Sequence, residues 1–211
     1  MNFIRKIVQP YSKEDAKLHS ELKKLLNFSP RKINKYKKAF THRSVQIIDN
    51  KGNPINYERL EFLGDSILGS VIAAYLYKKV PTGSEGYLTQ MRSKIVSRDH
   101  LNELGKDLNL IRFVKSKIIQ ANVGDNIHGN IFEALIGAIY LDKGYNFCQK
   151  FIYQNVIVPY VDIAKLEGKI ASYKGLIIEW CQKQKKKYSF DTYEDSGNDP
   201  VKHFSVKISI D

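Results

Sequence analysis

Cysteine is scarce in this chain of 211 residues, which contains only Cys148 and Cys181. Two cysteines cannot build a framework of several disulfides, and their spacing does not match the paired ligands of a zinc site. We therefore expect two ordinary thiols in a protein of a reducing compartment, and no cysteine-based metal chemistry.

The sequence also lacks recognisable targeting and membrane segments. Residues 1–13 hold a short apolar patch followed by charges, which is not the pattern of a secretory signal. The longest apolar run ends at Tyr77, where Lys78 and Lys79 follow, and it is too short to cross a bilayer. These absences predict a soluble, cytoplasmic protein that does not bind a membrane.

Acidic residues are outnumbered by basic ones. The chain has 22 Asp and Glu against 34 Lys and Arg, which gives a formal net charge of +12. A surface with this charge attracts polyanions, and its binding weakens as salt is raised. Nucleic acid is the class of partner that the charge favours. Hydrophobic residues make up 43% of the chain, which is enough to build a core beneath such a surface.

The acids that are present gather in one segment. Residues 58–66 read ERLEFLGDS, and on a helix the side chains of Glu58, Glu61 and Asp65 fall on one stripe. Apolar and small residues continue the helix to Tyr77. Burying a carboxylate costs several kcal/mol unless it is paired, hydrogen-bonded or bound to a metal. The stripe therefore predicts a bound cation.

A second segment repeats this pattern further along the chain. Asn130 offers an amide oxygen, Glu133 follows three residues later, and apolar and small residues lie beyond. Glycines in both segments allow two helices to approach closely and bring these oxygens together. Carboxylate and amide oxygens suit Mg²⁺ or Mn²⁺, and such sites usually carry out phosphoryl or phosphodiester transfer.

Helical periodicity dominates the chain up to about residue 165. Breaks rich in proline and glycine at residues 53–54 and 81–86 bracket the acidic helix. The segments with helical patterns are residues 12–26, 29–40, 58–77, 87–96, 97–108, 130–142 and 145–160.

The pattern changes beyond residue 165. Residues 172–185 stay helical, whereas residues 188–194 and 203–210 alternate apolar and polar side chains as strands do. The order helix, strand, turn, strand predicts a small α+β unit. Two strands and one helix bury too little surface to be stable alone, so we expect this unit to be incomplete. The predicted fold class is therefore mainly α, with a first domain at residues 1–165 and a second at residues 168–211.

These segments together resemble bacterial ribonuclease III over nearly the whole chain. Residues 58–66 match the signature segment of that family almost residue for residue. Three further segments agree in the same order: residues 39–44 (AFTHRS), residues 85–88 (EGYL) with Met91 and Arg92, and residues 132–138 (FEALIGA). The resemblance implies that the first domain is the all-helical endonuclease domain. The second would be a double-stranded RNA-binding domain without its last strand and helix.

The resemblance of the second domain is looser. Lys174, Glu179 and Gln182 fall where the first helix of such a domain has Lys, Glu and Gln, which implies that they bind RNA. An ungapped match places Pro200 where the family has a histidine, so His203 is not credited with that histidine's minor-groove contact. Four lysines form either a further RNA-binding patch or a solvated helix end: Lys183, Lys185, Lys186 and Lys187.

The same resemblance implies hydrolysis of duplex RNA with Mg²⁺, for which Mn²⁺ can substitute, in rRNA processing and RNA turnover. The products would carry 5′-phosphate and 3′-hydroxyl ends. The implied metal ligands are Glu61, Asp65, Asn130 and Glu133, of which Asp65 and Glu133 are the implied catalytic residues. Glu58 matches a secondary acid of the family, and the alternative is an exposed ion-pair partner or cap near the helix start.

Asn130 departs from the family, which has an aspartate at this position. An amide oxygen still coordinates Mg²⁺, but the missing charge weakens coordination. A catalytically silent relative that binds duplex RNA or the ribosome is therefore the alternative function. The retention of Glu61, Asp65 and Glu133 argues against it.

Two RNA strands require two active sites, and the family meets this need with a twofold homodimer. Phe62 matches a residue that inserts into the partner subunit, and the alternative is packing within its own chain. His42, within residues 39–44, is expected to pack or to form hydrogen bonds rather than to catalyse. RNA would be selected by its shape and 2′-hydroxyl groups rather than by its bases.

Overall fold

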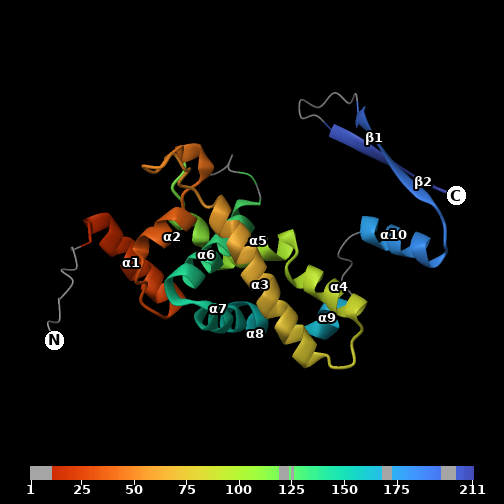
Figure 1. Ribbon diagram of the computed structural model, residues 1–211, viewed down its shortest axis with the longest axis horizontal. Helices are drawn as coiled ribbons and strands as arrows, with labels where there is room; N and C mark the ends of the chain where they lie inside the picture. The colour runs from red at the N-terminus through yellow and green to blue at the C-terminus, as the bar shows by residue number, and fades with distance from the viewer. Residues whose placement is uncertain (1–10, 119–123, 125, 168–172, 196–202) are drawn as a thin grey trace. The chain divides into compact units, whose positions relative to one another are not determined.

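The computed structural model describes residues 11–118, 124, 126–167, 173–195 and 203–211. The chain divides into two compact units, Met1–Gly168 and Lys169–Asp211. The first unit is helical and the second combines one helix with two strands (Figure 1). This mainly α architecture confirms the predicted fold class.

Helices build the described part of the first unit. In chain order they are α1 (Lys13–Leu26), α2 (Ile33–Ala39), α3 (Glu58–Lys79), α4 (Glu85–Ile95), α5 (Arg98–Asp107), α6 (Ile127–Lys143), α7 (Tyr145–Ile152), α8 (Val158–Tyr160) and α9 (Ile163–Glu167). Two 3-10 turns, η1 (Arg43–Val45) and η2 (Leu110–Phe113), and one π-helical turn, η4 (Tyr153–Ile157), lie between them.

Serine side chains cap three of these helices at their start. The hydroxyl oxygens of Ser12, Ser84 and Ser97 accept hydrogen bonds from the backbone N–H three residues later. Such caps satisfy donors that have no partner within the helix. The helices after Ser12 and Ser97 begin within one residue of the expected positions, whereas α4 begins two residues earlier than expected.

Glycines set the distance between α3 and α6 at the centre of the first unit. A Cβ atom on Gly64 would lie 1.7 Å from the carbonyl oxygen of Glu133, and one on Gly137 would lie 2.3 Å from the carbonyl oxygen of Leu60. Real Cβ atoms do not come this close, so only glycine lets the two backbones touch at these points. Residues 134–139 of α6 are buried.

A buried acid near the end of α6 holds the start of α2. The Asp142 carboxylate accepts hydrogen bonds from the backbone N–H groups of Arg31 and Lys32, at 2.9 and 2.8 Å, and from the Tyr36 hydroxyl at 3.0 Å. A negative charge there complements the free donors of the α2 N-terminus. The expected helix at residues 29–40 begins only at Ile33, directly after these two donors.

The expected helix at residues 145–160 is also modified. The chain is helical across this range, but Tyr153–Ile157 adopts the wider π geometry before α8. Pro159, the second residue of α8, has no N–H group to donate to an earlier carbonyl. A local π turn accommodates this missing hydrogen bond.

The second unit contains α10 (Tyr173–Lys183), β1 (Tyr188–Asp195) and β2 (His203–Ile210). The strands are antiparallel, with Tyr188 opposite Ile210 and Asp195 opposite His203. The helix and both strands agree with the sequence pattern to within two residues. Pro200, in the predicted turn, lies outside the described residues.

Among the described residues, one helix is long and apolar enough to cross a membrane, and it is α3, with a mean hydropathy of 1.3. This is weak evidence for a membrane span, because a core helix meets the same criteria. Packing accounts for the apolar face of α3, whose buried residues are Leu60, Gly64, Ile67, Leu68, Val71, Ile72 and Leu76.

Candidate active site

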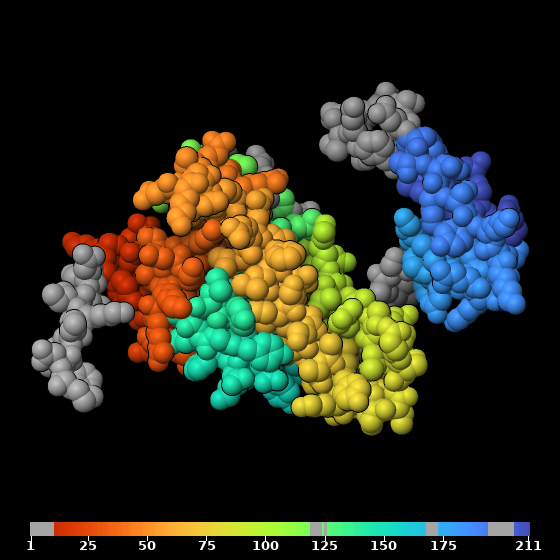
Figure 2. Space-filling view, viewed as in Figure 1, coloured from red at the N-terminus to blue at the C-terminus, as the bar shows by residue number. Residues whose placement is uncertain are grey.

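The first two turns of α3 carry the predicted acids towards solvent. Glu58 and Asp65 are exposed and Glu61 is half-buried, whereas Leu60 and Gly64 face the interior. α3 lies at the surface of the first unit, where it crosses the face shown in Figure 2. The acids therefore lie on a face that a large substrate can reach.

The first two turns of α6 bring Asn130 and Glu133 to the same place. Both side chains are half-buried. Because Gly64 packs on the backbone of Glu133, and Asp65 follows Gly64, the acids of the two helices meet where the helices touch. The predicted pairing of the two segments is thus present in the structure.

Neighbouring negative charges raise the pKa of two of these acids, Glu133 and Glu61. Burial, and after it the negative charges of Asp65 and Glu61, raise the pKa of Glu133 to about 8. Burial likewise raises the pKa of Glu61, as do Glu58 and Asp65. Arg98 at the start of α5 opposes both increases. The carboxylates share one electrostatic environment, which a bound cation would relieve.

The donor chemistry of this cluster fits a hard cation, because its oxygens come from carboxylates and one amide. The side chains do not form a finished ligand set, however. In the described parts of the chain, no group of three or more His, Cys, Asp or Glu residues is placed to hold a metal ion. The structure thus brings the predicted ligands close together without aiming them at one point.

Tyr57, which the sequence analysis missed, joins the two helices beside the acids. It is buried directly before α3, and burial raises its pKa while a hydrogen bond with the Asn130 side chain acts in the opposite direction. This contact ties the amide of Asn130 to the start of α3. Its position beside residues 58–66 is the only signal that the sequence offers for this role.

Glu58 forms an ion pair near the start of α3, as the alternative to a role as secondary acid predicts. Its Oε1 lies 3.7 Å from Arg43 Nη1, and its Oε2 accepts a hydrogen bond from Asn56 Nδ2 at 3.1 Å. The backbone N–H of Glu58 donates in return to Asn56 Oδ1 at 3.1 Å. Glu58 and Arg43 are both exposed, so the ion pair contributes little to stability.

His42 is packed and hydrogen-bonded, as the sequence predicts. Its side chain is 4% exposed, and its ring lies 5.8 Å from that of Tyr57. Its Nδ1 lies 2.9 Å from the hydroxyl of Ser44. Burial, the largest cause, lowers the pKa of His42, and the positive charge of Arg43 lowers it further. A neutral ring in these contacts supports the loop that precedes α3.

Comparison with known proteins identifies the family. A family model described as ribonuclease-III-like matches residues 33–160, which include α3 and α6. The chain belongs to the ribonuclease III family. Ribonuclease 3 of Zunongwangia profunda is 63% identical over 211 residues, which cover 100% of this chain and 87% of that protein. Ribonuclease 3 of Flavobacterium psychrophilum is 60% identical over 212 residues, with 100% and 86% covered.

A solved structure supports the same assignment. The nuclease domain of ribonuclease III from Campylobacter jejuni superposes with a TM-score of 0.59 at 28% identity, and covers 66% of this chain and 96% of that one. Together with the curated relatives, it identifies the chain as an endoribonuclease of the ribonuclease III family. The resemblance drawn from residues 58–66 and their three companion segments is confirmed.

Phe62 points away from the core of its own unit. Its side chain is 77% exposed on α3, next to the half-buried Glu61. The alternative that Phe62 packs within its own chain is therefore wrong. An exposed phenylalanine inside the signature segment of a ribonuclease III is available for contact with another molecule.

The three residues expected to bind RNA lie on α10, in the second unit. Lys174 and Glu179 already have partners within that unit: Lys174 Nζ lies 4.5 Å from the ring centre of Phe190, and Glu179 Oε1 lies 3.0 Å from Lys183 Nζ. Gln182 is exposed. Their contact with RNA stays a prediction.

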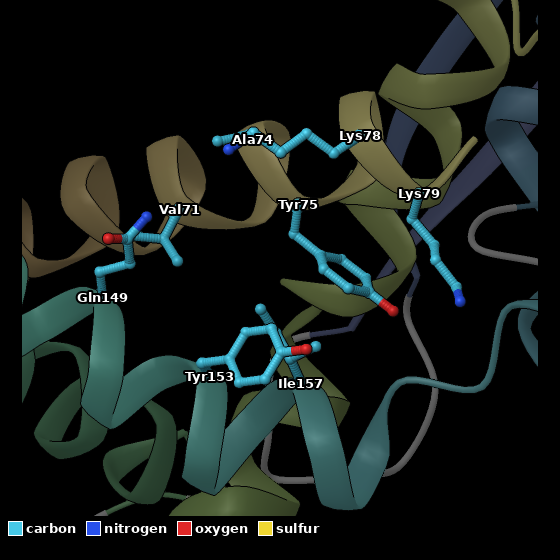
Figure 3. A pocket seen from close by; sticks show the side chains of 8 residues that line it. All are labelled: Val71, Ala74, Tyr75, Lys78, Lys79, Gln149, Tyr153 and Ile157. Atoms are coloured by element: carbon cyan, nitrogen blue, oxygen red, sulfur yellow. The ribbon is translucent and has the colours of Figure 1, made fainter. Parts of the chain in front are cut away.

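A hollow of about 300 Å³ lies beside the C-terminal half of α3 (Figure 3). Tyr75 and Tyr153 meet edge to face across it, with ring centres 6.3 Å apart. The other described residues that line it are Val71, Ala74, Lys78, Lys79, Gln149 and Ile157, and none is an acid. The acidic cluster is thus an open surface site, separate from this hollow.

Proposed function

We propose that this ribonuclease III hydrolyses double-stranded RNA with Mg²⁺, or with Mn²⁺ in its place, at the acidic cluster between α3 and α6. One observation carries the proposal: Glu61, Asp65 and Glu133 meet in one electrostatic environment where the two helix backbones touch. The net charge of +12 supports an RNA substrate. The relatives named Ribonuclease 3 support the reaction class.

Each residue of the cluster has a part in this proposal. Asp65 and Glu133 hold the metal as the principal ligands, and Glu61 and Asn130 complete the oxygen set. When bound, the ion supplies Lewis acidity that activates the attacking water and stabilises charge on the departing 3′ oxygen. Because its pKa is raised to about 8, Glu133 would have to lose a proton before it could act as a ligand, so metal binding would strengthen as pH rises.

Attack in line with the 3′ oxygen leaves 5′-phosphate and 3′-hydroxyl ends on the cleaved strand. Maturation of rRNA and turnover of other RNAs in the cytoplasm are the processes that supply such duplexes. Residues 1–165 would form the endonuclease domain in this scheme. Residues 168–211 would bind duplex RNA through Lys174, Glu179 and Gln182.

A homodimer completes the scheme, because one chain carries one acidic cluster and a duplex has two strands. Phe62 is the contact that we propose between the subunits, since it is exposed beside the acids. The Campylobacter jejuni nuclease domain is described as having a flexible region involved in dimer formation. Phe62→Ala should shift the sedimentation of the protein from dimer towards monomer, whereas an unchanged dimer would remove Phe62 from the interface.

Cleavage assays on a long RNA duplex and on its separated strands test the central proposal. With Mg²⁺ or Mn²⁺ the duplex should be cut and the single strands left intact, and EDTA should stop the reaction. Mass spectrometry of the fragments should find 5′-phosphate ends.

A catalytically silent relative is the second candidate, and Asn130 in place of the family aspartate is the observation that favours it. If the protein binds the duplex but leaves it uncut at every concentration of either metal, this second function replaces the first.

A further inference from the structure

Asn102 on α5 caps the start of α6, a helix to which it does not belong. Its Oδ1 accepts a hydrogen bond from the backbone N–H of Gly129 at 2.8 Å, and its Nδ2 donates to Asn126 Oδ1 at 3.4 Å. Asn126 is the N-cap residue of α6, yet its side chain makes no capping bond to the described helix. The cap that a helix usually takes from its own first residue therefore comes from α5.

Close backbone packing fixes the two helices at this point. A Cβ atom on Gly105 of α5 would lie 2.2 Å from the carbonyl oxygen of His128, and one on Gly129 would lie 3.1 Å from Asn102 Oδ1. Asn102 itself is 8% exposed. A buried amide that meets a backbone donor in so tight a contact specifies one position for the first turn of α6.

That first turn leads directly into the acidic cluster. Asn130 follows Gly129 in the chain, and Glu133 lies about one helical turn further on. α5 also carries Arg98, one turn before Asn102, and the charge of Arg98 acts on both Glu61 and Glu133. α5 therefore faces the cluster as well as the start of α6.

We infer that Asn102 is a positioning residue for the metal site. By holding the Gly129 N–H group, it fixes the first turn of α6 and keeps the backbone of Asn130 and Glu133 beside the acids of α3. Partners that orient metal ligands typically change metal affinity by 10- to 100-fold when they are removed. This inference rests on the proposed function, because it assumes that α3 and α6 bind a metal.

Mn²⁺ binding by the full chain without RNA, followed by electron paramagnetic resonance, tests the role of Asn102 independently of cleavage. Asn102→Ala removes both hydrogen bonds and should weaken Mn²⁺ binding about tenfold. Asn102→Asp keeps an oxygen acceptor for Gly129 and should restore binding to within about threefold of wild type. Melting temperatures of all variants show whether each one is folded.

Ser84→Ala is the matched control, because it removes the cap of another helix. The Ser84 hydroxyl accepts a hydrogen bond from the Tyr87 N–H at 3.3 Å at the start of α4. This variant should lower the melting temperature as a lost cap does, but leave Mn²⁺ affinity unchanged. A purely structural role of Asn102 would give Asn102→Ala the same pair of results.

Three outcomes would overturn the inference. Wild-type Mn²⁺ affinity in a folded Asn102→Ala would do so, whatever its melting temperature. If Asn102→Ala does not fold, a tenfold weaker affinity in a folded Asn102→Asp would do so, because the acceptor is then not what matters. An unchanged Mn²⁺ affinity in Glu133→Ala would instead overturn the proposed metal site, and the inference with it.

Discussion

The two helices of the site carry similar side chains in different surroundings. On α3, Glu58 and Asp65 are exposed, so water screens their charges. On α6, Glu133 precedes a fully buried run at residues 134–139, and burial raises its pKa to about 8. α3 thus places two carboxylates in solvent, whereas α6 holds a carboxylate whose pKa is raised by burial and by its acidic neighbours.

Removing one carboxylate from each helix should show the largest difference between α6 and α3, measured as the rate of RNA cleavage. Glu133→Gln should reduce the single-turnover rate of duplex cleavage about 1,000-fold, because Glu133 is a proposed metal ligand and loss of such a charge costs several kcal/mol of transition-state stabilisation. Glu58→Gln should change the rate by less than about fivefold, since Glu58 forms an exposed ion pair with Arg43. Equal losses of cleavage rate in both variants would contradict the proposed difference between Glu133 and Glu58.

Backbone contact between the helices can be broken with one methyl group. Gly64→Ala places a Cβ atom 1.7 Å from the Glu133 carbonyl oxygen, and should lower the free energy of unfolding by about 3 kcal/mol. Gly69→Ala is the control on the same helix, because nothing lies within 4 Å of its added Cβ. It should stabilise α3 by about 0.5–1 kcal/mol. Urea unfolding measures both, and similar values would contradict the close packing.

The raised pKa of Glu133 gives stability a pH dependence in EDTA. The folded state holds this proton up to about pH 8 and the unfolded state only up to its ordinary value of 4.5, so stability falls as pH rises between these values. The full shift corresponds to at most about 5 kcal/mol, and solvent near the partly exposed carboxylate should reduce this to about 2 kcal/mol.

Glu133→Gln removes the titration and should be the more stable protein at pH 9 by that amount. Well below pH 4.5 the two proteins should unfold alike, because the wild-type side chain is then neutral in both states. Thermal unfolding at a series of pH values measures the difference. A constant difference at every pH would mean that Glu133 is not desolvated.

The smallest expected effect concerns the amide on α6. Asn130→Asp adds a negative charge to the metal ligands and should lower the Mg²⁺ concentration for half-maximal cleavage about three- to tenfold. Tyr57→Phe removes the hydroxyl that contacts Asn130, and should raise that concentration in the wild-type background. Unchanged Mg²⁺ dependence in both variants would show that residue 130 is not a ligand.

Sequence reasoning located most of this site because the patterns involved are local. The spacing of Glu58, Glu61 and Asp65, and of Asn130 and Glu133, predicted two acidic helices, and glycines predicted their close approach. The helices and strands were predicted for the same reason, since caps and periodicity depend on neighbouring residues. The matching segments added the family, which the comparisons confirmed.

The residues that sequence reasoning missed act across the fold. Tyr57, Arg98 and Asn102 touch or influence the acids from outside the two acidic segments. Apart from the place of Tyr57 beside residues 58–66, nothing near them along the chain indicates this. The contact of Asp142 with the start of α2 is of the same kind, because it joins residues more than 100 positions apart. The exposure of Phe62 is likewise a property of the assembled unit rather than of its segment.

Asp142 also affects local unfolding of the first unit. Its carboxylate ties the end of α6 to α2, while Asn102 ties the start of α6 to α5. A helix anchored at both ends and buried between them cannot exchange its amide protons by local fraying. The amides in the middle of α6 should therefore be the slowest in the unit to take up deuterium. Heat should then inactivate the enzyme only when the whole unit unfolds.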